Sequence, residues 1–577
     1  MFEGGDPGIC GAFYTAADVM QDRQEAINWF LERDPEEHAK EPIAMLGCPG
    51  LNQLVATKLG PVRGMWPLPG NKQGLAVTGN TVYLITVTQS ATQTAIALLS
   101  AVAVGTMATN SGPVCIRDNG VLQNGLGGYA LIVDGVNCYY YLLSGATYLN
   151  SFTATTNTTV SIAFTGSLPN GLIVSSGGTL SSASNSIIGG TKVISVDTVG
   201  LTLTMSQSAI SSVMNDTVTL TIPPFGKITD PGFLGAQRIA FIEGWLIFNQ
   251  PNSRTFYTTG PTPYQVLFPG AFFALKDSST DNLITLFENE RELYLVGERT
   301  TEVWYNAGLA NFAFSRIPGV GPQIGCAAVN SIVRVGDSLV WLGANEQGQN
   351  VVVRTEQYSF RKVSNFAVDN AIAQYPLVSD AIAYAYEDGG HLFYVLTFPT
   401  ADVTWCLDVT TEQWHKRLSF TTSTATFHRH RSNCYMNLAD LVIVGDYQTG
   451  ALLQMSRKYF TDNGNPLVAV RRSPHIWSKA NRERVFFSSM QIEFTPGVGL
   501  QSGQGSNPQV MLRYSDDGGF TWSDEMWVTI GAVGEYRNRA IWYLLGGNTR
   551  DRIWETKISD PVPRDVIGAT CYVEKAA

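Results

Sequence analysis

The feature of this 577-residue sequence that most restricts its fold is a hairpin unit that occurs seven times. Each copy has an apolar strand, a glycine-containing or polar turn, and a second strand with aromatic or β-branched residues, the pattern of two antiparallel strands. The copies start at Leu75, Ala130, Trp245, Leu293, Leu339, Leu392 and Leu441. From Trp245 onward they start 46 to 53 residues apart, and the first two start 55 residues apart. A period near 50 residues is typical of propeller blades.

A repeat of this length has a physical reason. One small sheet cannot bury both of its faces alone, so copies that pack radially against each other share a core. We therefore predict an all-β fold, with a β-propeller of six or seven blades, an inserted small β-domain and a C-terminal β-domain. The composition agrees, because 56 glycines and only 15% charged residues favour strands and tight turns over amphipathic helices. The alternative is a pair of β-sandwiches whose hairpins fall at this period by chance.

The interval between the second and third copies is more than twice the repeat. It contains residues 148–222, a segment whose only charged residues are Lys192, Asp197 and Asp216. Short strands alternate there with Gly, Ser and Asn turns, which predicts a small β-domain, with a disordered linker as the alternative. We expect an N-terminal strand segment over 1–59, the propeller over 60–147 and 223–464, the insertion over 148–222, and the C-terminal β-domain over 465–577.

Charge and cysteine content limit the class of protein. A formal net charge of −10 argues against a chain that grips nucleic acid through its phosphates. The eight cysteines are scattered without a CxxC pair, which predicts free and mostly buried thiols. The first residues show no secretory signal, and the most apolar stretch, 95–104, is about half the length that a membrane-spanning helix needs. We expect assembly inside a cell and no transmembrane segment.

Arginines concentrate among aromatic residues near the C-terminal end: Arg471, Arg472, Arg482, Arg484, Arg513, Arg537, Arg539, Arg550 and Arg552. A mixture of Arg and Trp can bind nucleic acid. Carboxylates lie among these arginines, however: Glu483, Asp516, Asp517, Asp524, Glu525, Glu535 and Asp551. The pattern therefore favours ion pairs and cation–π packing within the domain.

Residues Ser515 to Trp522 fit the S-x-D-x-G-x-T-W pattern called an Asp-box, which is best known from sialidase-type propellers. Asp517 can accept backbone N–H bonds, the Gly518-Gly519 pair permits positive φ, and Trp522 can bury the outer face of the turn. That role is structural. A glycosidase needs positioned carboxylates in addition, and a sialidase needs an arginine cluster with an activated tyrosine. Tyr514 and the nearby acidic residues do not establish such a geometry.

Two further groups carry side chains that occur in metal or acid–base sites. His428 and His430 lie two residues apart on a predicted strand and can in principle bind a metal, but no third ligand is apparent, which favours a solvated or hydrogen-bonded strand. Asp380, His391, Asp408 and His415 come without a nucleophile elbow, a P-loop or an HExxH motif. We predict no catalytic, cofactor-binding or metal-binding residues, no cofactor and no enzymatic activity.

Several aromatic residues and glycines can be interpreted either as structural residues or as residues of a binding site. The aromatic residues Trp304, Tyr305, Trp405, Trp414, Trp542 and Tyr543 could stack bases or sugars, but their alternating strand positions favour core packing. Gly74 and Gly79 do not have the spacing of a dinucleotide fingerprint, and we interpret them as turn glycines.

A series of segments, in order along the chain, resembles the packaged-DNA stabilisation proteins of short-tailed bacteriophages, also described as tail hub or nozzle proteins. These are QEAINWFLE (Gln24 to Glu32), LGCPGL (Leu46 to Leu51), GPVRGM (Gly60 to Met65), ELYLVGERTTEVWYNAG (Glu292 to Gly308), VWLGANEQGQNVV (Val340 to Val352) and the stretch from Gly390 to Arg417. The resemblance covers nearly the whole chain. It is lost over the insertion and around Leu544 to Thr549.

The resemblance implies a structural protein of the virion tail, assembled in the cytoplasm of the bacterial host. It implies a homohexameric ring below the portal and the adaptor (head-to-tail) protein, which closes the DNA exit channel, retains packaged DNA and allows its ejection. A needle, fibre or tailspike would be a further partner, and double-stranded DNA would pass through the lumen without sequence-specific binding. An acidic wall fits this function, because it repels phosphate and lets DNA slide.

Two other functions compete with this one. The first is a glycan-binding or glycan-cleaving propeller of a phage tail, and the weaker second is a murein-degrading tail component. No paired catalytic carboxylates can be named for either.

Overall fold

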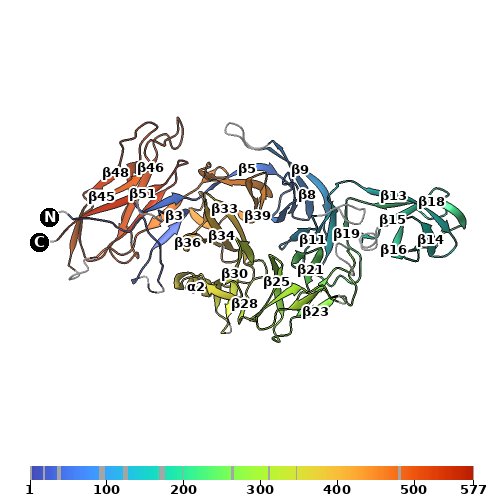
Figure 1. Cartoon of the computed structure of the whole chain (residues 1–577). Coiled ribbons are helices and arrows are strands. Elements are labelled where there is room, and N and C mark those ends of the chain that lie inside the picture. The colour runs from blue at the N-terminus through green and yellow to red at the C-terminus, as the bar shows by residue number, and fades with distance from the viewer. Residues whose placement is uncertain are drawn as a thin grey trace.

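The computed structural model describes residues 3–16, 18, 20–34, 40–89, 98–120, 128–166, 168, 176–197, 199–260, 266–309, 312–345, 347–477 and 483–575. The molecule is elongated, with a β-sandwich at one end, a propeller in the middle and a small barrel at the other end, and both termini lie at the sandwich end (Figure 1). One α-helix, α2 (Phe366–Ala373), lies among the strands of the described residues, and its first turn is capped by Asn365. None of the described helices is long and apolar enough to cross a membrane.

The propeller has seven antiparallel blades. Blade 1 is β6 (Val62–Pro67), β7 (Gln73–Thr78), β8 (Thr81–Gln89) and β9 (Leu98–Thr106), and blade 2 is β10 (Cys115–Asp118), β11 (Tyr129–Val133), β12 (Cys138–Leu142) and β19 (Phe225–Lys227). Blade 3 is β20 (Ile239–Ile242), β21 (Trp245–Asn249), β22 (Thr255–Thr258) and β23 (Phe273–Leu275), and blade 4 is β24 (Leu283–Asn289), β25 (Glu292–Gly297), β26 (Thr301–Asn306) and β27 (Phe314–Arg316).

The remaining blades follow the same plan. Blade 5 is β28 (Ile324–Cys326) and β29 (Val333–Val335) beside β30 (Ser338–Asn345), β31 (Asn350–Glu356) and β32 (Ser359–Lys362). Blade 6 is β33 (Ile382–Asp388), β34 (His391–Phe398), β35 (Val403–Asp408) and β36 (Gln413–Lys416). Blade 7 takes β39 (Ser432–Leu438), β40 (Leu441–Asp446) and β41 (Ala451–Ser456) from one part of the chain and β5 (Gly50–Ala56) from the N-terminal part.

Each predicted hairpin copy forms the second and third strands of one blade. The copy at Leu75 is β7–β8, for example, and the copy at Leu441 is β40–β41. The prediction of a propeller is therefore confirmed, with seven blades, and the alternative of two β-sandwiches in its place is wrong. The blades pack as expected, because separate apolar clusters fill the interfaces between neighbouring blades all round the ring.

The ring is closed by strands from distant parts of the chain. β5 pairs antiparallel with β41, from Gly50 opposite Ser456 to Ala56 opposite Ala451. Gly50 is needed there, because a Cβ atom at that position would lie 2.4 Å from the carbonyl oxygen of Tyr459. The outer strand of blade 7 therefore comes from the N-terminal segment, and the ring is complete only when the two parts of the chain meet.

The insertion forms a closed six-stranded barrel between the third and fourth strands of blade 2. Its strands are β13 (Tyr148–Thr156), β14 (Ser161–Thr165), β15 (Thr179–Ser182), β16 (Thr191–Asp197), β17 (Thr202–Met205) and β18 (Val213–Ile222). The apolar core of the barrel is continuous with the core between blades 2 and 3. The expectation of an ordered β-domain is confirmed for the described residues, and the disordered linker is not what these residues form.

The C-terminal part is a β-sandwich. One sheet contains β1 (Glu3–Gly5), β3 (Trp29–Arg33), β4 (Ile43–Gly47), β45 (Val485–Phe494), β48 (Ala540–Tyr543), β49 (Gly547–Thr549) and β51 (Val566–Lys575). The other sheet contains β44 (Ala469–Arg472), β46 (Gln509–Ser515), β47 (Met526–Thr529) and β50 (Ile553–Ile558). This second sheet continues through β2 (Glu25–Ile27) into blade 6, so that nine strands form one sheet in the order β33-β34-β35-β36-β2-β44-β50-β46-β47.

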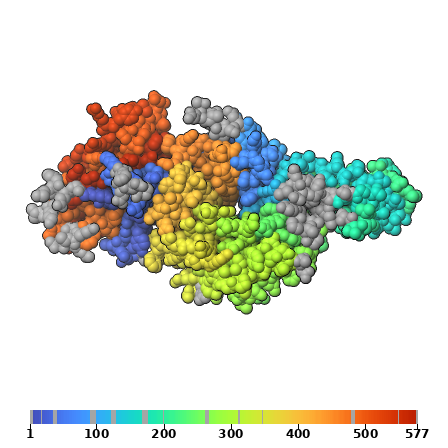
Figure 2. Space-filling model, viewed as in Figure 1, coloured from blue at the N-terminus to red at the C-terminus, as the bar shows by residue number. Residues whose placement is uncertain are grey.

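The attachment points explain the elongated shape. The barrel leaves the outer edge of blade 2, and the sandwich continues from the outer edge of blade 6. These blades are three or four positions apart in a ring of seven, so they lie on nearly opposite sides. The sandwich and the barrel therefore point away from each other (Figures 1 and 2).

Two smaller predictions have clear outcomes. All eight cysteines are free, and six of them are buried, as expected. Gly79 is a turn glycine with φ 54°, but Gly74 is not, because it lies inside β7. A Cβ atom on Gly74 would lie 2.9 Å from the sulfur of Met436 in blade 7, so close packing between blades is the reason for glycine at this position.

Candidate functional site

The part of the molecule that joins the propeller to the sandwich is the candidate functional site. We call it the joint, and define it as the five adjacent strands β36, β2, β44, β50 and β46. β2 runs parallel to β36, with Ile27 opposite Lys416, and antiparallel to β44. A three-residue strand from near the N-terminus thus fills the space between two domains that are otherwise built from later parts of the chain.

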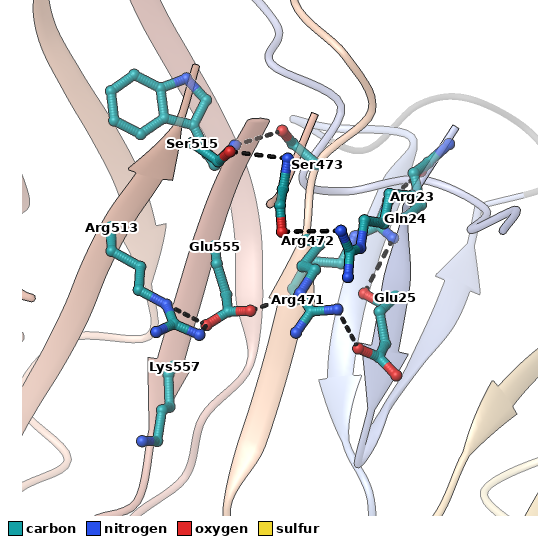
Figure 3. A network of polar contacts seen from close by, with 12 residues as sticks. Arg23, Gln24, Glu25, Arg471, Arg472, Ser473, Arg513, Ser515, Glu555 and Lys557 are labelled. Carbon is teal, nitrogen blue, oxygen red and sulfur yellow. Dashed lines mark hydrogen bonds and ion pairs between the residues drawn. The ribbon is translucent and has the colours of Figure 1, made fainter. Parts of the chain in front are cut away.

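A ladder of alternating charges crosses the joint from the propeller to the sandwich, and Figure 3 shows its part from Glu25 to Arg513. Lys416 of β36 binds Glu25 of β2 at 2.9 Å, and Glu25 binds Arg472 of β44 at 2.8 Å. Arg472 binds Glu555 of β50 at 2.5 Å, and Glu555 also binds Arg513 of β46 at 2.5 Å. The last four residues are direct cross-strand neighbours, so the strand register itself places opposite charges side by side.

Burial makes this ladder stronger than a surface ion pair. The side chain of Glu555 is 3% exposed and that of Glu25 is 17% exposed, so water screens their charges weakly. Burial alone would raise the pKa of Glu25, but the charges of Lys416 and Arg472 outweigh it and hold this pKa below its ordinary value. Glu25 is therefore ionised in the folded protein, and its contribution to stability is present at neutral pH and is lost as the pH falls through the range in which carboxylates protonate.

Asn28 fastens the same region through hydrogen bonds. Its side-chain nitrogen donates to the carbonyl oxygens of Leu418 at 2.8 Å and Val468 at 2.7 Å, and its side-chain oxygen accepts from the backbone N–H of Leu418 at 3.0 Å. The residue is buried and has φ 58°, a conformation that asparagine tolerates better than most residues. One side chain therefore ties the N-terminal segment to the chain that directly follows blade 6 and to the start of the sandwich.

Arg471 has a different role from its neighbour Arg472. It is fully buried, and its guanidinium donates to the carbonyl oxygens of Ile9 at 2.8 Å and Gly8 at 2.9 Å and to the side chain of Gln24 at 3.0 Å. Burial lowers the pKa of Arg471 to about 10, which leaves it charged at neutral pH. This arginine holds the N-terminal segment against β44.

Comparison with protein families places this joint between two recognised domains. Residues 136–459 match the family described as bacteriophage P22 Gp10, beta-propeller, and residues 473–574 match bacteriophage P22 Gp10, beta-sandwich. The first match alone covers more than half of the chain. The chain belongs to the bacteriophage P22 Gp10 family of packaged-DNA stabilisation proteins. No curated protein matched the chain in a separate search.

Membership of the P22 Gp10 family confirms the resemblance stated from the sequence segments and the combination of a propeller with a C-terminal β-domain. It is a family of structural phage proteins. The matched ranges also show what the structure adds, because blade 1 and the strands β2 and β5 precede the matched residues. The N-terminal strands that complete the joint and close the ring were therefore found only in the structure.

The Asp-box of this P22 Gp10 family member forms the turn after β46, beside the joint. Asp517 accepts hydrogen bonds from the backbone N–H of Thr521 at 2.9 Å and from the hydroxyl groups of Ser515 at 2.7 Å and Thr521 at 2.6 Å. These bonds hold the pKa of Asp517 well below its ordinary value. Both glycines have positive φ, at 73° and 87°. The predicted structural turn is confirmed, and the carboxylate of Asp517 accepts hydrogen bonds within this turn.

Three of the predicted arginines, Arg472, Arg513 and Arg552, form both ion pairs and cation–π contacts, as predicted. Arg552 binds both carboxylate oxygens of Asp516, at 2.6 and 2.7 Å, and lies 3.8 Å from the ring centroid of Tyr514. Arg513 lies 4.8 Å from the ring centroid of Trp522, which is partly buried rather than fully covered. The sequence did not identify Glu25 and Glu555 as partners, and Arg482 lies outside the described residues.

The structure brings His391 and Asp408 together and leaves Asp380 apart. Nδ1 of His391 lies 2.7 Å from Asp408, and Nε2 lies 2.9 Å from Glu32 of β3. Burial opposes the charge of His391, but the hydrogen bonds to both carboxylates outweigh it and raise the pKa. Asp380 instead accepts hydrogen bonds from the backbone and side chain of Thr400.

The surroundings of these residues are those of a packed core. His415 is buried, and burial together with the neighbouring Arg417 lowers its pKa well below the ordinary value. The cavity beside His415 and Asp408 has a volume of about 10 Å³, which holds about one water molecule. This space is too small for a substrate. We therefore assign His391 to fastening β3 onto blade 6.

His428 and His430 do not share a binding site. His428 is bound to Asp402 at 2.7 Å and to the hydroxyl of Thr426 at 3.0 Å, whereas His430 is buried and bound to Ser432 at 2.6 Å. Burial lowers the pKa of His430 to about 3. The hydrogen-bonded interpretation is confirmed for both residues, and the described residues contain no group of three or more metal-ligating side chains.

The tryptophans among the singled-out aromatic residues are core residues, as predicted. Trp304, Trp405, Trp414 and Trp542 are buried. Each indole N–H donates within the fold, to Glu302, Tyr375, the carbonyl of Val363 and the carbonyl of Met526 respectively. The adjacent Tyr305 and Tyr543 are exposed, at 42% and 69%, so the prediction of core packing is wrong for these two residues, whose side chains point to the opposite face of the strand from the tryptophans.

Proposed function

We propose that copies of this chain assemble into a homohexameric ring in the phage tail, below the portal and the adaptor protein. The ring closes the DNA exit channel, retains the packaged DNA and allows its ejection. The observation that carries this proposal is the continuous nine-stranded sheet, which fuses the propeller and the sandwich into one body. A wall that resists the pressure of packaged DNA needs such a joint, because a flexible linker would let the two domains move apart.

Charge supports the proposal that DNA slides through this ring. The chain has a formal net charge of −10, so a lumen formed by its general surface repels phosphate rather than binding it. In this proposal double-stranded DNA passes without sequence-specific contacts, and a needle, fibre or tailspike meets the tail at this point. We further propose that none of the described residues takes part in catalysis or binds a cofactor or metal, and that the chain is assembled into virions in the host cytoplasm.

The parts of the chain have separate roles in the proposal. We retain the division into residues 1–59, 60–147, 148–222, 223–464 and 465–577, with the propeller as tube wall. The barrel and the sandwich make contacts between subunits or with tail partners. Exposed apolar side chains on the barrel support this role, among them Leu149 at 63%, Val199 at 94% and Met214 at 80%.

Virions that lack this chain test the proposal. Particles assembled without it should package DNA and then lose it, so that the DNA becomes accessible to added nuclease, and supplying the purified chain during assembly should restore protection. Particles assembled without the adaptor protein serve as the comparison for loss at an earlier step. Particles that lack this chain and still protect their DNA as long as complete virions would contradict the proposal.

The glycan-binding alternative has less support. The tryptophans that suggested sugar stacking are buried and their N–H groups are bonded within the fold. Trp527 of β47 is 54% exposed and is the residue through which this alternative can be tested. Glycan binding that is lost in Trp527→Ala, with folding intact, would favour the alternative over the ring.

A further inference from the structure

The axis of the propeller contains a cavity of about 860 Å³ that is separate from the joint. All seven blades contribute to its lining, from Trp66 in blade 1 to Tyr435 in blade 7. Blade 3 contributes Gln237 and Arg238, which immediately precede its innermost strand. A volume of this size is in the range of about 300–1,000 Å³ that small-molecule sites occupy. The cavity lies within a single chain, so it is distinct from the lumen of the proposed ring.

The charge of this lining is opposite to that of the whole chain. Five arginines contribute to it, namely Arg63, Arg117, Arg238, Arg334 and Arg429, against the two carboxylates Glu288 and Asp380. The chain as a whole carries a formal net charge of −10. A concave site with a local excess of positive charge concentrates anions.

Two of these arginines contact the same aromatic ring, that of Phe287. The guanidinium carbon of Arg117 is 5.6 Å from the ring centroid of Phe287 and 4.1 Å from that of Trp66, and the guanidinium carbon of Arg238 is 5.4 Å from that of Phe287. Arg117 is bound to Glu288 at 3.1 Å. Arg238 forms no ion pair within the described part of the chain. The carboxylate of Glu288 is therefore the one negative charge beside the two positive charges of Arg117 and Arg238.

Several polar atoms at this site have no partner within the protein. Nε of Arg238 and the second carboxylate oxygen of Glu288 are buried without a hydrogen bond among the described residues, as are Nη1 of Arg429 and one oxygen of Asp380. Burial lowers the pKa of Arg238, and the neighbouring Arg117 acts in the same direction. A partly buried guanidinium with a buried, unused Nε donor and no carboxylate of its own is poorly compensated by the protein alone.

We propose that the axial cavity binds a small multivalent oxyanion, a phosphate or a polycarboxylate, between Arg117 and Arg238. A guanidinium presents paired N–H donors that match two oxygens of such an anion, and the aromatic rings of Trp66 and Phe287 hold the guanidinium groups in place. The bound anion connects blades 2 and 3 and thereby stabilises the ring of blades. This inference does not depend on the assembly of the chain into a tail.

Thermal unfolding of the full chain tests the site. Inorganic phosphate and citrate are titrated separately at constant ionic strength, with sodium chloride as the comparison. We expect a saturable rise in Tm with at least one of them, and which anion is effective shows whether phosphate or carboxylate is the preferred chemistry. A Tm that follows ionic strength alone, with no difference from chloride, would mean that the cavity holds only water and would overturn the proposal.

Two variants of cavity residues and one control variant show whether the anion-dependent rise in Tm comes from binding in the axial cavity. Arg238→Gln should weaken anion binding at least tenfold, while leaving the Tm without anion unchanged or higher, because an uncompensated charge has been removed. Glu288→Gln should tighten binding severalfold, because Arg117 is released to the anion, and this variant decides the matter should Arg238→Gln fail to fold. Arg291→Gln, at an arginine 87% exposed and outside the lining, should behave as the unchanged chain. Equal anion effects in all of these variants would also overturn the proposal.

Discussion

Asn28 shows how much of the joint depends on a single side chain. It binds backbone groups of two segments that are about 390 and 440 positions later in the sequence, and it does so from a backbone conformation with positive φ. Few other residues combine that conformation with a side chain that both donates and accepts hydrogen bonds.

Asn28→Ala should therefore lower the free energy of unfolding by about 3 kcal/mol, because buried carbonyl and N–H groups of Leu418 and Val468 lose their partners. Chemical denaturation measures this loss. Asn252→Ala is the matched control, since Asn252 has φ 55° but is exposed, and its loss should be about 1 kcal/mol from backbone strain alone. Equal losses in the two variants would show that the hydrogen bonds of Asn28 contribute nothing.

His391 should make stability depend on pH. Its pKa in the folded protein is raised above the ordinary 6.5, so its stabilising contribution is fully present below pH 6.5 and is lost as the pH rises through the raised pKa. His415 and His430 have lowered pKa values and stay neutral in the folded state, so they make stability rise as the pH rises through about 6.5, opposite to the effect of His391. This opposing contribution is present both in the unchanged chain and in a His391 variant.

We expect the free energy of unfolding of the unchanged chain to fall relative to that of His391→Gln as the pH rises above about 6.5. Chemical denaturation at a series of pH values gives both curves. Parallel curves for the unchanged chain and His391→Gln would contradict the role assigned to the Glu32 and Asp408 contacts.

At the scale of the element, the joint is a β-sheet that crosses a domain boundary. Its charge ladder follows from the register, because each cross-strand step places a carboxylate beside a cation. Removing one partner leaves the other charges partly buried and unpaired, which costs more than the loss of a surface pair.

Glu555→Gln should lower the free energy of unfolding by about 2–4 kcal/mol, because Arg513 loses its carboxylate and Arg472 keeps only Glu25, at a position 3% exposed. Glu356→Gln is the control, since Glu356 is half-exposed and lies 3.7 Å from Arg361, and it should change stability by less than about 0.5 kcal/mol. Differential scanning calorimetry compares the two, and separate unfolding of sandwich and propeller is expected to appear in Glu555→Gln. A single unchanged transition would show that the ladder does not couple the domains.

The repeated elements were predictable and the joint was not. The seven hairpins follow from local alternation of apolar residues, a signal that a sequence contains in full. The partners of Arg472, in contrast, are Glu25 and Glu555, which are distant in sequence and are brought together only by the fold. The segment QEAINWFLE contributed to the family resemblance and contains both Glu25 and Asn28, but its sequence alone did not show that it would lie between two domains.

Close packing between blades was also not predictable from the sequence. Gly74 was interpreted as a turn residue because glycine is common in turns, whereas its position in β7 is set by the side chain of Met436 from another blade. Such contacts depend on the closure of the ring by β5, which no local pattern specifies. For the candidate site, the sequence thus predicted which residue types interact, arginine with carboxylate. It did not predict which arginine pairs with which carboxylate.

At the scale of the whole molecule, the two attachments decide how one chain can serve a tail. The sandwich and the barrel leave nearly opposite blades, so a copy reaches in two directions from its propeller (Figure 1). The rigid joint fixes the sandwich relative to the propeller, and the shared core anchors the barrel to blades 2 and 3. These connections suit a subunit that contacts different neighbours at its two ends.

The most direct test of the central claim is cryo-electron microscopy of the parent virion, with the tail reconstructed without imposed symmetry. The account predicts a closed ring of six copies at the exit of the tail, with propellers forming the wall around a channel and with sandwich and barrel at subunit or partner contacts. A chain that lies at the periphery of the tail as a monomer or trimer, away from the DNA channel, would contradict it.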